Sequence, residues 1–228
     1  MKARKKAEND SIGPKSRKVP SGLLRDKSRT QARMVASVGK VLQKKGYPGL
    51  TPPNIAAAAG VDKKLVWAYF GGLDNLIEEY FQQKDFWKVG SKNVISDMLA
   101  SPDTIGREAI YTLLQNQFDT LVKDKVLQKF IHWELGENNK MLRKVADERE
   151  EIGEQLFKVL EPDFKDSDVN LRATLALLIG GIYYLSLHAH SNGSTFCGID
   201  INIDEGKRQI DDTIKDIIYR IFDNSKKK

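Results

Sequence analysis

The sequence predicts an all-α protein of about nine helices, in which a three-helix helix-turn-helix domain precedes a larger helical domain. Apolar residues recur at three- and four-residue steps along most of the 228 residues, and no segment alternates convincingly as a β-strand does. A composition of 40% hydrophobic and 30% charged residues is typical of a globular protein with a sizeable core. We expect an arm (1–27), a helix-turn-helix domain (28–75) and a second helical domain (76–228).

The first 27 residues are polar and basic. They hold nine lysines and arginines against three acids, and Pro14 and Pro20 interrupt them. Because they lack apolar periodicity, we expect a disordered arm. The chain has a net charge of +6 that is concentrated in its N-terminal third. This asymmetry favours an anionic partner such as nucleic acid on that side, although a solvated tail without a partner is the alternative for the arm.

The first predicted helix begins at Ser28. Its apolar residues fall on one face and its basic residues on the others, and Gly46 suits the left-handed residue that ends a helix. The apolar set is Met34, Val35, Val38, Val41 and Leu42, and the basic set is Arg29, Arg33, Lys40 and Lys44.

The stretch LTPPNIAAAAGVDKKLVWAYF (50–70) predicts two short helices joined by a sharp turn. Thr51 can cap the first helix, and a proline is tolerated in the first turn that follows. Small alanines near its end allow a close approach of the second helix, and Gly60 suits a turn that needs positive φ. Asp62 can cap the second helix, in which Val66 and Phe70 face the core.

This spacing leaves four residues of the second helix facing outward: Lys63, Lys64, Trp67 and Ala68. In a helix-turn-helix, the N-terminal part of the second helix enters the major groove of DNA. Lysines at that position can bind guanine edges or phosphates. An ordinary corner between two helices, with solvated lysines, is the alternative interpretation.

Residues 28–77 resemble the DNA-binding domain of the TetR family of transcriptional regulators. The matching features are Gly46-Tyr47, Thr51, Ile55-Ala56, Ala59-Gly60-Val61, the aromatic end Trp67-Ala68-Tyr69-Phe70, and Leu76. The resemblance implies a dimeric regulator that binds double-stranded DNA, and the family leans towards repression. The DNA-contacting residues that we expect are Arg29, Thr51, Lys63, Lys64, Leu65, Trp67, Ala68 and Tyr69.

Two positions depart from the family pattern. Trp67 stands where the family usually has a tyrosine that touches a phosphate, and an indole N–H can donate to a phosphate oxygen but cannot accept. Gly71-Gly72-Leu73 stands where the family often has a lysine, so one cationic phosphate contact is lost. Backbone amides at the start of the next helix could still bind phosphate.

Four further helical segments follow before the last two helices. The first begins near Leu76 and runs to about Lys88, and the second lies between Asp103 and Val122, with Ile110, Leu113, Leu114, Gln117, Phe118 and Leu121 in one stripe. A third carries Val126 to Trp133, and a fourth carries Leu142 to Leu160 with Pro162 just beyond it. The two last helices cover 169–189 and 204–222, and the segment between them is predicted to be a loop.

These two last helices are the most apolar of the chain, which suits dimerisation. Gly180-Gly181 would allow close backbone packing, and an isoleucine stripe runs along the last helix. The resemblance implies a four-helix bundle made from these helices of two subunits. The interface residues that we expect are Leu178, Ile182, Ile210, Ile214, Ile217 and Ile221. Completion of a monomer's core is the alternative.

The resemblance also implies a pocket for a small-molecule effector between the middle helices. Binding there would reposition the two recognition helices and weaken DNA binding. The candidate pocket residues are Phe86, Trp87, Tyr111, Phe118, His132 and Trp133, with His132 as the polar handle. Packing in an ordinary core is the alternative for each aromatic residue.

Other classes of protein find little support in the sequence. One cysteine (Cys197) and three histidines give no metal-ligand spacing, and no phosphate loop or nucleophile elbow is present. We therefore expect no enzyme activity, no metal and no cofactor. The apolar run Leu175–Leu187 is too short to span a membrane and suits a buried helix, so we expect a cytoplasmic protein. The alternative function is an architectural or division-associated DNA-binding factor without ligand control.

Overall fold

The computed structural model describes residues 21–84, 91–101 and 105–226, which are helical almost throughout. The predicted all-α class is confirmed, with ten α-helices in these residues rather than about nine. The elements are α1 (Ser21–Lys45), η1 (Tyr47–Gly49), α2 (Pro52–Ala59), α3 (Lys64–Phe70), α4 (Leu73–Lys84), α5 (Ser91–Ala100), α6 (Arg107–Lys123), α7 (Lys125–Gly136), α8 (Lys140–Leu160), η4 (Glu161–Phe164), α9 (Leu171–Asn192) and α10 (Asp204–Ser225).

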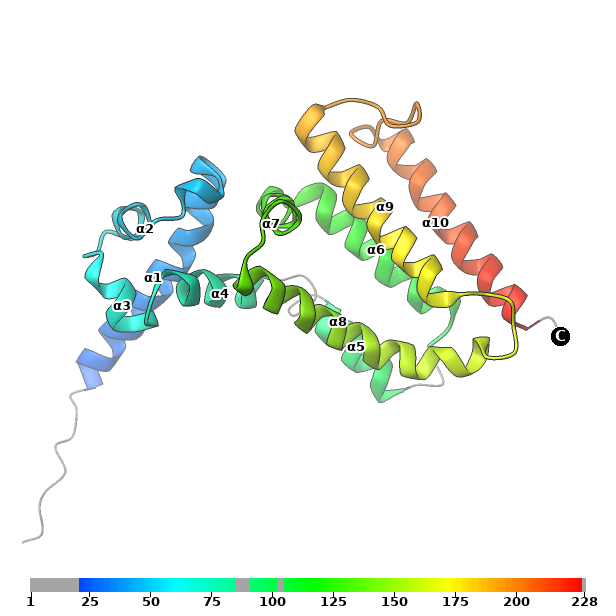
Figure 1. The fold of residues 1–228 in the computed structure, drawn as a ribbon, viewed down its shortest axis with the longest axis horizontal. Helices are drawn as coiled ribbons and strands as arrows, with labels where there is room; N and C mark the ends of the chain where they lie inside the picture. The colour runs from blue at the N-terminus through cyan, green and yellow to red at the C-terminus, as the bar shows by residue number, and fades with distance from the viewer. Residues whose placement is uncertain (1–20, 85–90, 102–104, 227–228) are drawn as a thin grey trace, which may run out of the picture.

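The helices form two groups along the long axis of the molecule (Figure 1). Helices α1 to α4 gather at one end, where α1 packs against both α2 and α4. Helices α6, α9 and α10 lie at the other end, with α6 in contact with both α9 and α10. Helix α8 runs between the groups and contacts α4 and α5. Helix α4 belongs to the first group (Figure 1), whereas the boundary predicted from the sequence falls inside it, between residues 75 and 76. The division into domains at that point stays a prediction.

Helix α1 begins earlier than the sequence suggested. We expected a disordered arm up to residue 27, but the helix starts at Ser21, so the last seven of those residues are helical. Pro20 is the last proline before the helix, and the hydrogen-bond ladder of an α-helix can run without interruption after it. The ammonium of Lys27 lies 5.3 Å from the centre of the Tyr69 ring on α3. Residues 1–20 lie outside the described part of the chain.

Helix α7 joins the two groups of helices. The Tyr47 ring stacks on Trp133 with their centres 5.7 Å apart, and the Tyr47 hydroxyl donates to Glu137 at 2.8 Å. The ammonium of Lys129 donates to the Gln43 carbonyl at 2.6 Å, which satisfies an acceptor at the C-terminal end of α1. A displacement of α7 would therefore act directly on α1 and η1 through these contacts.

Candidate nucleic-acid interface and effector domain

Helix α2 begins as the sequence predicts. The Thr51 hydroxyl accepts a hydrogen bond from the backbone N–H of Asn54 at 3.4 Å, and Pro52 occupies the first helical position. Ile55, Ala56 and Ala59 are buried on one face of the helix. The small alanines allow α2 to pack closely against α1 and α3, and this packing fixes the orientation of α3 within the domain.

The turn between α2 and α3 has the left-handed residue that glycine accommodates. Gly60 has a φ of 65°, and the amides of Gly60 and Val61 donate to the Ala57 and Ala56 carbonyls at 3.2 and 3.0 Å. The Asp62 carboxylate then accepts from the backbone N–H of Lys64 at 2.7 Å. Asp62 thus caps the start of α3 and places a negative charge at its positive end.

Helix α3 presents one face to the core and the other to solvent. Val66 is fully buried, whereas Lys63, Lys64 and Ala68 are exposed and Trp67 keeps 54% of its surface. These are the four residues that the sequence placed on the outward face, so their exposure is confirmed. The contact of this face with DNA stays a prediction.

The other residues expected to contact DNA differ in their burial and in their contacts. Leu65 and Tyr69 are half-buried and pack against the hydrophobic core. Arg29 is exposed on α1. The side chain of Thr51 is already engaged as the cap of α2. Leu65 and Tyr69 therefore help to hold α3 on the domain as well as flanking its exposed face.

The junction of α3 and α4 explains one departure from the family pattern. Gly71 ends α3 in a left-handed conformation with a φ of 75°, and the Asn75 amide donates to the Phe70 carbonyl at 2.7 Å. Leu73 is half-buried against the core, so it holds the start of α4 in place. This junction presents no cation to a DNA backbone where the family often offers a lysine.

The candidate effector residues that the structure describes differ in their burial. Phe118 is fully buried, Tyr111 and Trp133 are each 7% exposed, and His132 is exposed on α7. Consecutive residues of a helix point about 100° apart, so the burial of Trp133 turns His132 outward. His132 is therefore poorly placed as the polar handle of an internal pocket. Phe86 and Trp87 lie outside the described residues.

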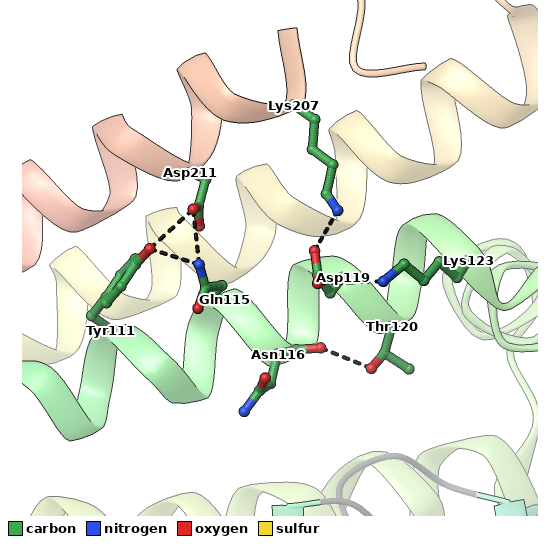
Figure 2. A network of polar contacts seen from close by, with 8 residues as sticks. All are labelled: Tyr111, Gln115, Asn116, Asp119, Thr120, Lys123, Lys207 and Asp211. Atoms are coloured by element: carbon green, nitrogen blue, oxygen red, sulfur yellow. Dashed lines mark hydrogen bonds and ion pairs between the residues drawn. The ribbon is translucent and has the colours of Figure 1, made fainter. Parts of the chain in front are cut away.

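Tyr111 is engaged in a polar ladder between α6 and α10. Its hydroxyl donates to the Asp211 carboxylate at 2.9 Å, and the Gln115 amide donates to the same oxygen at 2.9 Å (Figure 2). Burial and the neighbouring Asp211 raise the pKa of Tyr111 to about 12. Further along α6, Asp119 pairs with Lys207 at 2.5 Å (Figure 2).

The ladder continues towards the other end of both helices, where Arg107 pairs with Asp223 at 2.7 Å and Glu108 accepts from the Tyr219 hydroxyl. The α10 members Lys207, Asp211, Tyr219 and Asp223 are separated by four or eight residues, which places them on one face of that helix. Sequence reasoning missed this ladder. The four-residue spacing of polar residues on both segments is the signal that could have revealed it.

The expected dimer interface needs a correction. Ile182 and Ile214 are only 1% and 3% exposed, so both pack inside the protomer and have no surface left for a partner. Leu178, Ile210, Ile217 and Ile221 are half-buried. The large apolar side chains left in solvent near this end are instead Leu177 (78% exposed), Tyr184 (51%), Phe196 (40%) and Ile203 (56%). The correction therefore applies to Ile182 and Ile214, and the role of the other four residues stays a prediction.

Helix α9 is less covered than the sequence suggested. We expected a helix over 169–189 with a buried apolar run, and α9 spans 22 residues, Leu171–Asn192. Within the described residues it is the one helix long and apolar enough to cross a membrane, with a mean hydropathy of 1.3 over its best window and 22% of that window buried. A Cβ added at Gly180 or Gly181 would meet nothing within 4 Å in the protomer. One side of α9 is thus apolar, carries the small residues Gly180 and Gly181, and is exposed to solvent.

Comparison with known proteins supports the helix-turn-helix assignment. A family model for bacterial regulatory proteins of the tetR family matches residues 40–80. No curated protein matches the chain. The resemblance to TetR-family regulators noted from the sequence is thereby confirmed for the N-terminal domain.

Several solved structures share the fold over nearly their whole length. FadR of Bacillus subtilis, a transcriptional regulator bound to stearoyl-CoA, is 16% identical with a TM-score of 0.59 and covers 82% of this chain and 96% of its own. NalD of Pseudomonas aeruginosa, the secondary repressor of a multidrug efflux pump, is 16% identical with a TM-score of 0.59 and covers 86% and 97%. FadR of Thermus thermophilus, bound to lauroyl-CoA, is 15% identical with a TM-score of 0.52 and covers 87% and 95%.

Proposed function

Because this chain carries the N-terminal domain of TetR-family regulators, we propose that it is a dimeric transcriptional repressor that a small-molecule effector releases from a palindromic operator. The observation that carries the proposal is the exposed face of α3, where Lys63, Lys64 and Trp67 stand free on a short helix anchored by Val66. The N-terminal half of such a helix reaches base edges in the major groove. A cytoplasmic location follows from this role.

The proposed contacts to DNA are of two kinds, those that can reach base edges and those that bind phosphates. Lys63 and Lys64 are placed to bind guanine edges or phosphates, and the Trp67 indole N–H can donate to a phosphate oxygen. Arg29 and the basic residues before it add charge that neutralises phosphates without reading sequence. Because Leu73 offers no charge at the start of α4, we expect the basic N-terminal segment to supply a larger share of the backbone contacts than in a typical relative.

Dimerisation follows from the open side of α9. A monomer that leaves Leu177 at 78% exposure beside Gly180 and Gly181 presents an apolar surface that a second copy can cover. Tyr184 stacks on His188 with ring centres 5.6 Å apart and meets Phe196 edge-on at 4.9 Å, which extends this surface towards the α9–α10 loop. Two copies related by a two-fold axis would place two α3 helices on one palindrome.

The effector acts through the contacts of α7 with α1 and η1, which connect the two groups of helices. Lys129 of α7 binds the end of α1, and Trp133 of α7 stacks on Tyr47 of η1, so a shift of α7 changes the position of the helix-turn-helix domain. Stearoyl-CoA and lauroyl-CoA are the first effectors to try, because structures of the same fold are bound to them. Control by an effector distinguishes this function from that of an architectural DNA-binding factor.

The proposal is tested by selecting bound sequences from random duplex DNA and measuring affinity by fluorescence anisotropy. Lys64→Ala should weaken operator binding by about 1–3 kcal/mol and relax the preference at one base pair if Lys64 contacts a base. A phosphate contact would weaken all sequences alike. Lys165→Ala removes the same charge from an exposed position just after η4 and should leave affinity unchanged. Recovery of no preferred sequence by the wild-type chain would refute the function.

A further inference from the structure

We propose that a groove between α1 and α4, inside the helix-turn-helix domain, binds a small uncharged aromatic molecule, and that the bound molecule strengthens the binding of DNA. The second half of this inference rests on the proposed function, because it gives the DNA-binding domain a ligand of its own. The first half stands on the shape of the groove, its aromatic lining and a buried hydroxyl without a partner.

The groove has a volume of about 710 Å³, and its described lining comes from α1, α3 and α4 alone. Small side chains on α1 leave this space open. Ser28, Ala32 and Ala36 follow one another at four-residue steps, so they lie on one face of the helix. Val35, which is 5% exposed, forms an apolar floor beside them. A hollow of this volume is within the usual range for small-molecule sites.

Three aromatic side chains line the same groove. Tyr69 and Phe70 come from the end of α3 and are half-buried, and Tyr80 comes from α4 and is 5% exposed. Aromatic rings gain energy from offset or edge-to-face contact with other rings, beyond the burial of their surface. This lining therefore favours a flat aromatic ligand over a saturated one of similar size.

The Tyr80 hydroxyl is the buried polar group that such a ligand can satisfy. It forms no hydrogen bond with the described residues. It lies against Gly39 of α1, where an added Cβ would clash with its oxygen. Gly39 follows Val35 and Ala36 by four and three residues, so the hydroxyl faces the side of α1 that lines the groove. Burial and, to a lesser extent, the Asp124 carboxylate raise the pKa of Tyr80. The hydroxyl therefore keeps its proton and can donate to a ligand.

The rest of the polar lining favours an uncharged ligand. Its carboxylate, Glu79, already accepts a hydrogen bond from the Gln83 amide at 2.8 Å. Gln31 has no such partner among the described residues, so its amide can both donate to a ligand and accept from it. The described lining includes no lysine or arginine, and the ammonium of Lys27 is placed over the Tyr69 ring at 5.3 Å. An anion therefore finds no counter-charge in the groove, whereas an amide or hydroxyl group finds hydrogen-bonding partners.

A molecule in this groove would join α3 to α1 and α4. The face of α3 that carries Lys63, Lys64 and Trp67 stays exposed, because the groove uses Tyr69 and Phe70 instead. A ligand that contacts all three helices favours the arrangement in which they are packed together. It also reduces the freedom that α3 would otherwise lose when it binds DNA. The ligand should therefore raise operator affinity, which is opposite to the effect of the proposed effector.

The first experiment compares three ligands of similar shape: naphthalene-2-carboxamide, naphthalene-2-carboxylate and decalin-2-carboxamide. Binding to the full-length protein is measured by isothermal titration calorimetry at neutral pH. We expect the aromatic carboxamide to bind at least about fivefold more tightly than the carboxylate, which enters without a counter-charge. It should bind about two- to tenfold more tightly than the saturated carboxamide, which lacks the ring contacts. Equal or tighter binding of either comparison ligand would overturn the proposal.

The second experiment locates the site with two variants and a control. Ala36→Leu fills the groove from an exposed position and should weaken binding of naphthalene-2-carboxamide at least about tenfold. Tyr80→Phe removes only the hydroxyl and should weaken binding about two- to tenfold, which is the range of one hydrogen bond. Ala100→Leu is the matched control, because it adds the same side chain at an exposed position of α5 outside the groove.

The stability of Tyr80→Phe without ligand gives an independent reading. Because the hydroxyl has no partner to lose, the variant should be at least as stable as wild type in urea unfolding. A loss of stability would show that the hydroxyl is already hydrogen-bonded, and it would overturn the role of Tyr80 as the anchor of the ligand.

Operator affinity, measured by fluorescence anisotropy with and without naphthalene-2-carboxamide, separates this inference from the proposed function. We expect the ligand to tighten operator binding about two- to fivefold in wild type and to have no effect in Ala36→Leu. Unchanged or weaker DNA binding would overturn the effect on α3. Ligand binding that is equally strong in Ala36→Leu and Ala100→Leu would overturn the site, while operator binding would still support the proposed function. A chain that binds the carboxamide but selects no DNA sequence would refute the proposed function alone.

Discussion

Two buried glutamines on neighbouring helices should respond in opposite directions to the same substitution. Gln117 of α6 is 1% exposed, and neither its amide nitrogen nor its amide oxygen has a hydrogen-bond partner. Gln128 of α7 is 2% exposed, but its amide nitrogen donates to the Leu121 carbonyl at 2.5 Å and to the Val122 carbonyl at 3.2 Å. Helices α6 and α7 are in contact, so both sites belong to one region of the core.

Methionine has nearly the volume of glutamine and needs no hydrogen bond. A buried polar group without a partner costs about 1–3 kcal/mol, so Gln117→Met should raise the free energy of unfolding by about that amount. Gln128→Met removes two bonds to carbonyls at the end of α6 and leaves those acceptors buried. The same substitution removes the Gln128 amide oxygen, which has no hydrogen-bond partner, and this offsets part of the cost. The net destabilisation should therefore be about 1–2 kcal/mol.

The assay is urea unfolding followed by circular dichroism at one fixed protein concentration, because association would otherwise shift the midpoint. Thermal unfolding gives a second reading, with about 2–4 °C expected for each kcal/mol in a chain of this size. The reasoning fails if Gln117→Met destabilises the protein as much as Gln128→Met does. That result would mean that the Gln117 amide is hydrogen-bonded in solution.

Two further predictions concern association and pH. Leu177→Glu should convert the proposed dimer into a monomer in sedimentation experiments, whereas Leu135→Glu, at a residue of α7 that is 68% exposed, should leave the proposed dimer intact. Monomeric wild-type protein at micromolar concentration would contradict the interface. Burial alone would raise the pKa of Asp119, but the ion pair with Lys207 outweighs it and lowers that pKa. Its contribution to stability is therefore complete above the ordinary carboxyl pKa and lost as the pH falls through the lowered one. Asp119→Asn should be less stable than wild type at pH 7 and equally stable at the acid end of the titration, and a constant difference would exclude this role.

The helix-turn-helix could be predicted almost residue by residue because its determinants are local. A threonine cap, prolines in a first turn, a glycine with positive φ and an aspartate cap each act within a few residues of their position. Such signals need no knowledge of distant contacts. The early start of α1 is the exception in this region, because polar composition alone does not show how far a helix extends beyond its packed face.

The second domain was less predictable because its surfaces depend on which helices meet. Ile182 and Ile214 were expected between two subunits, yet both are buried in the protomer. An apolar stripe shows that a helix buries one face, but it does not say which neighbour covers that face. The same limit applies to Tyr111, whose aromatic ring suggested a pocket and whose hydroxyl is bound to Asp211 on α10.

The sequence by itself determined the helical class, the cap and turn residues of the helix-turn-helix, and the outward position of Lys63, Lys64 and Trp67. Hydrophobic periodicity and capping chemistry are properties of neighbouring residues, so they can be read along the chain. Only the tertiary structure decided that Arg149 turns into the core while Glu148 and Glu151 line a groove, and that Leu177 rather than Ile182 stays open to a partner. These assignments depend on the rotation of each helix against partners far away in sequence, which local periodicity leaves free.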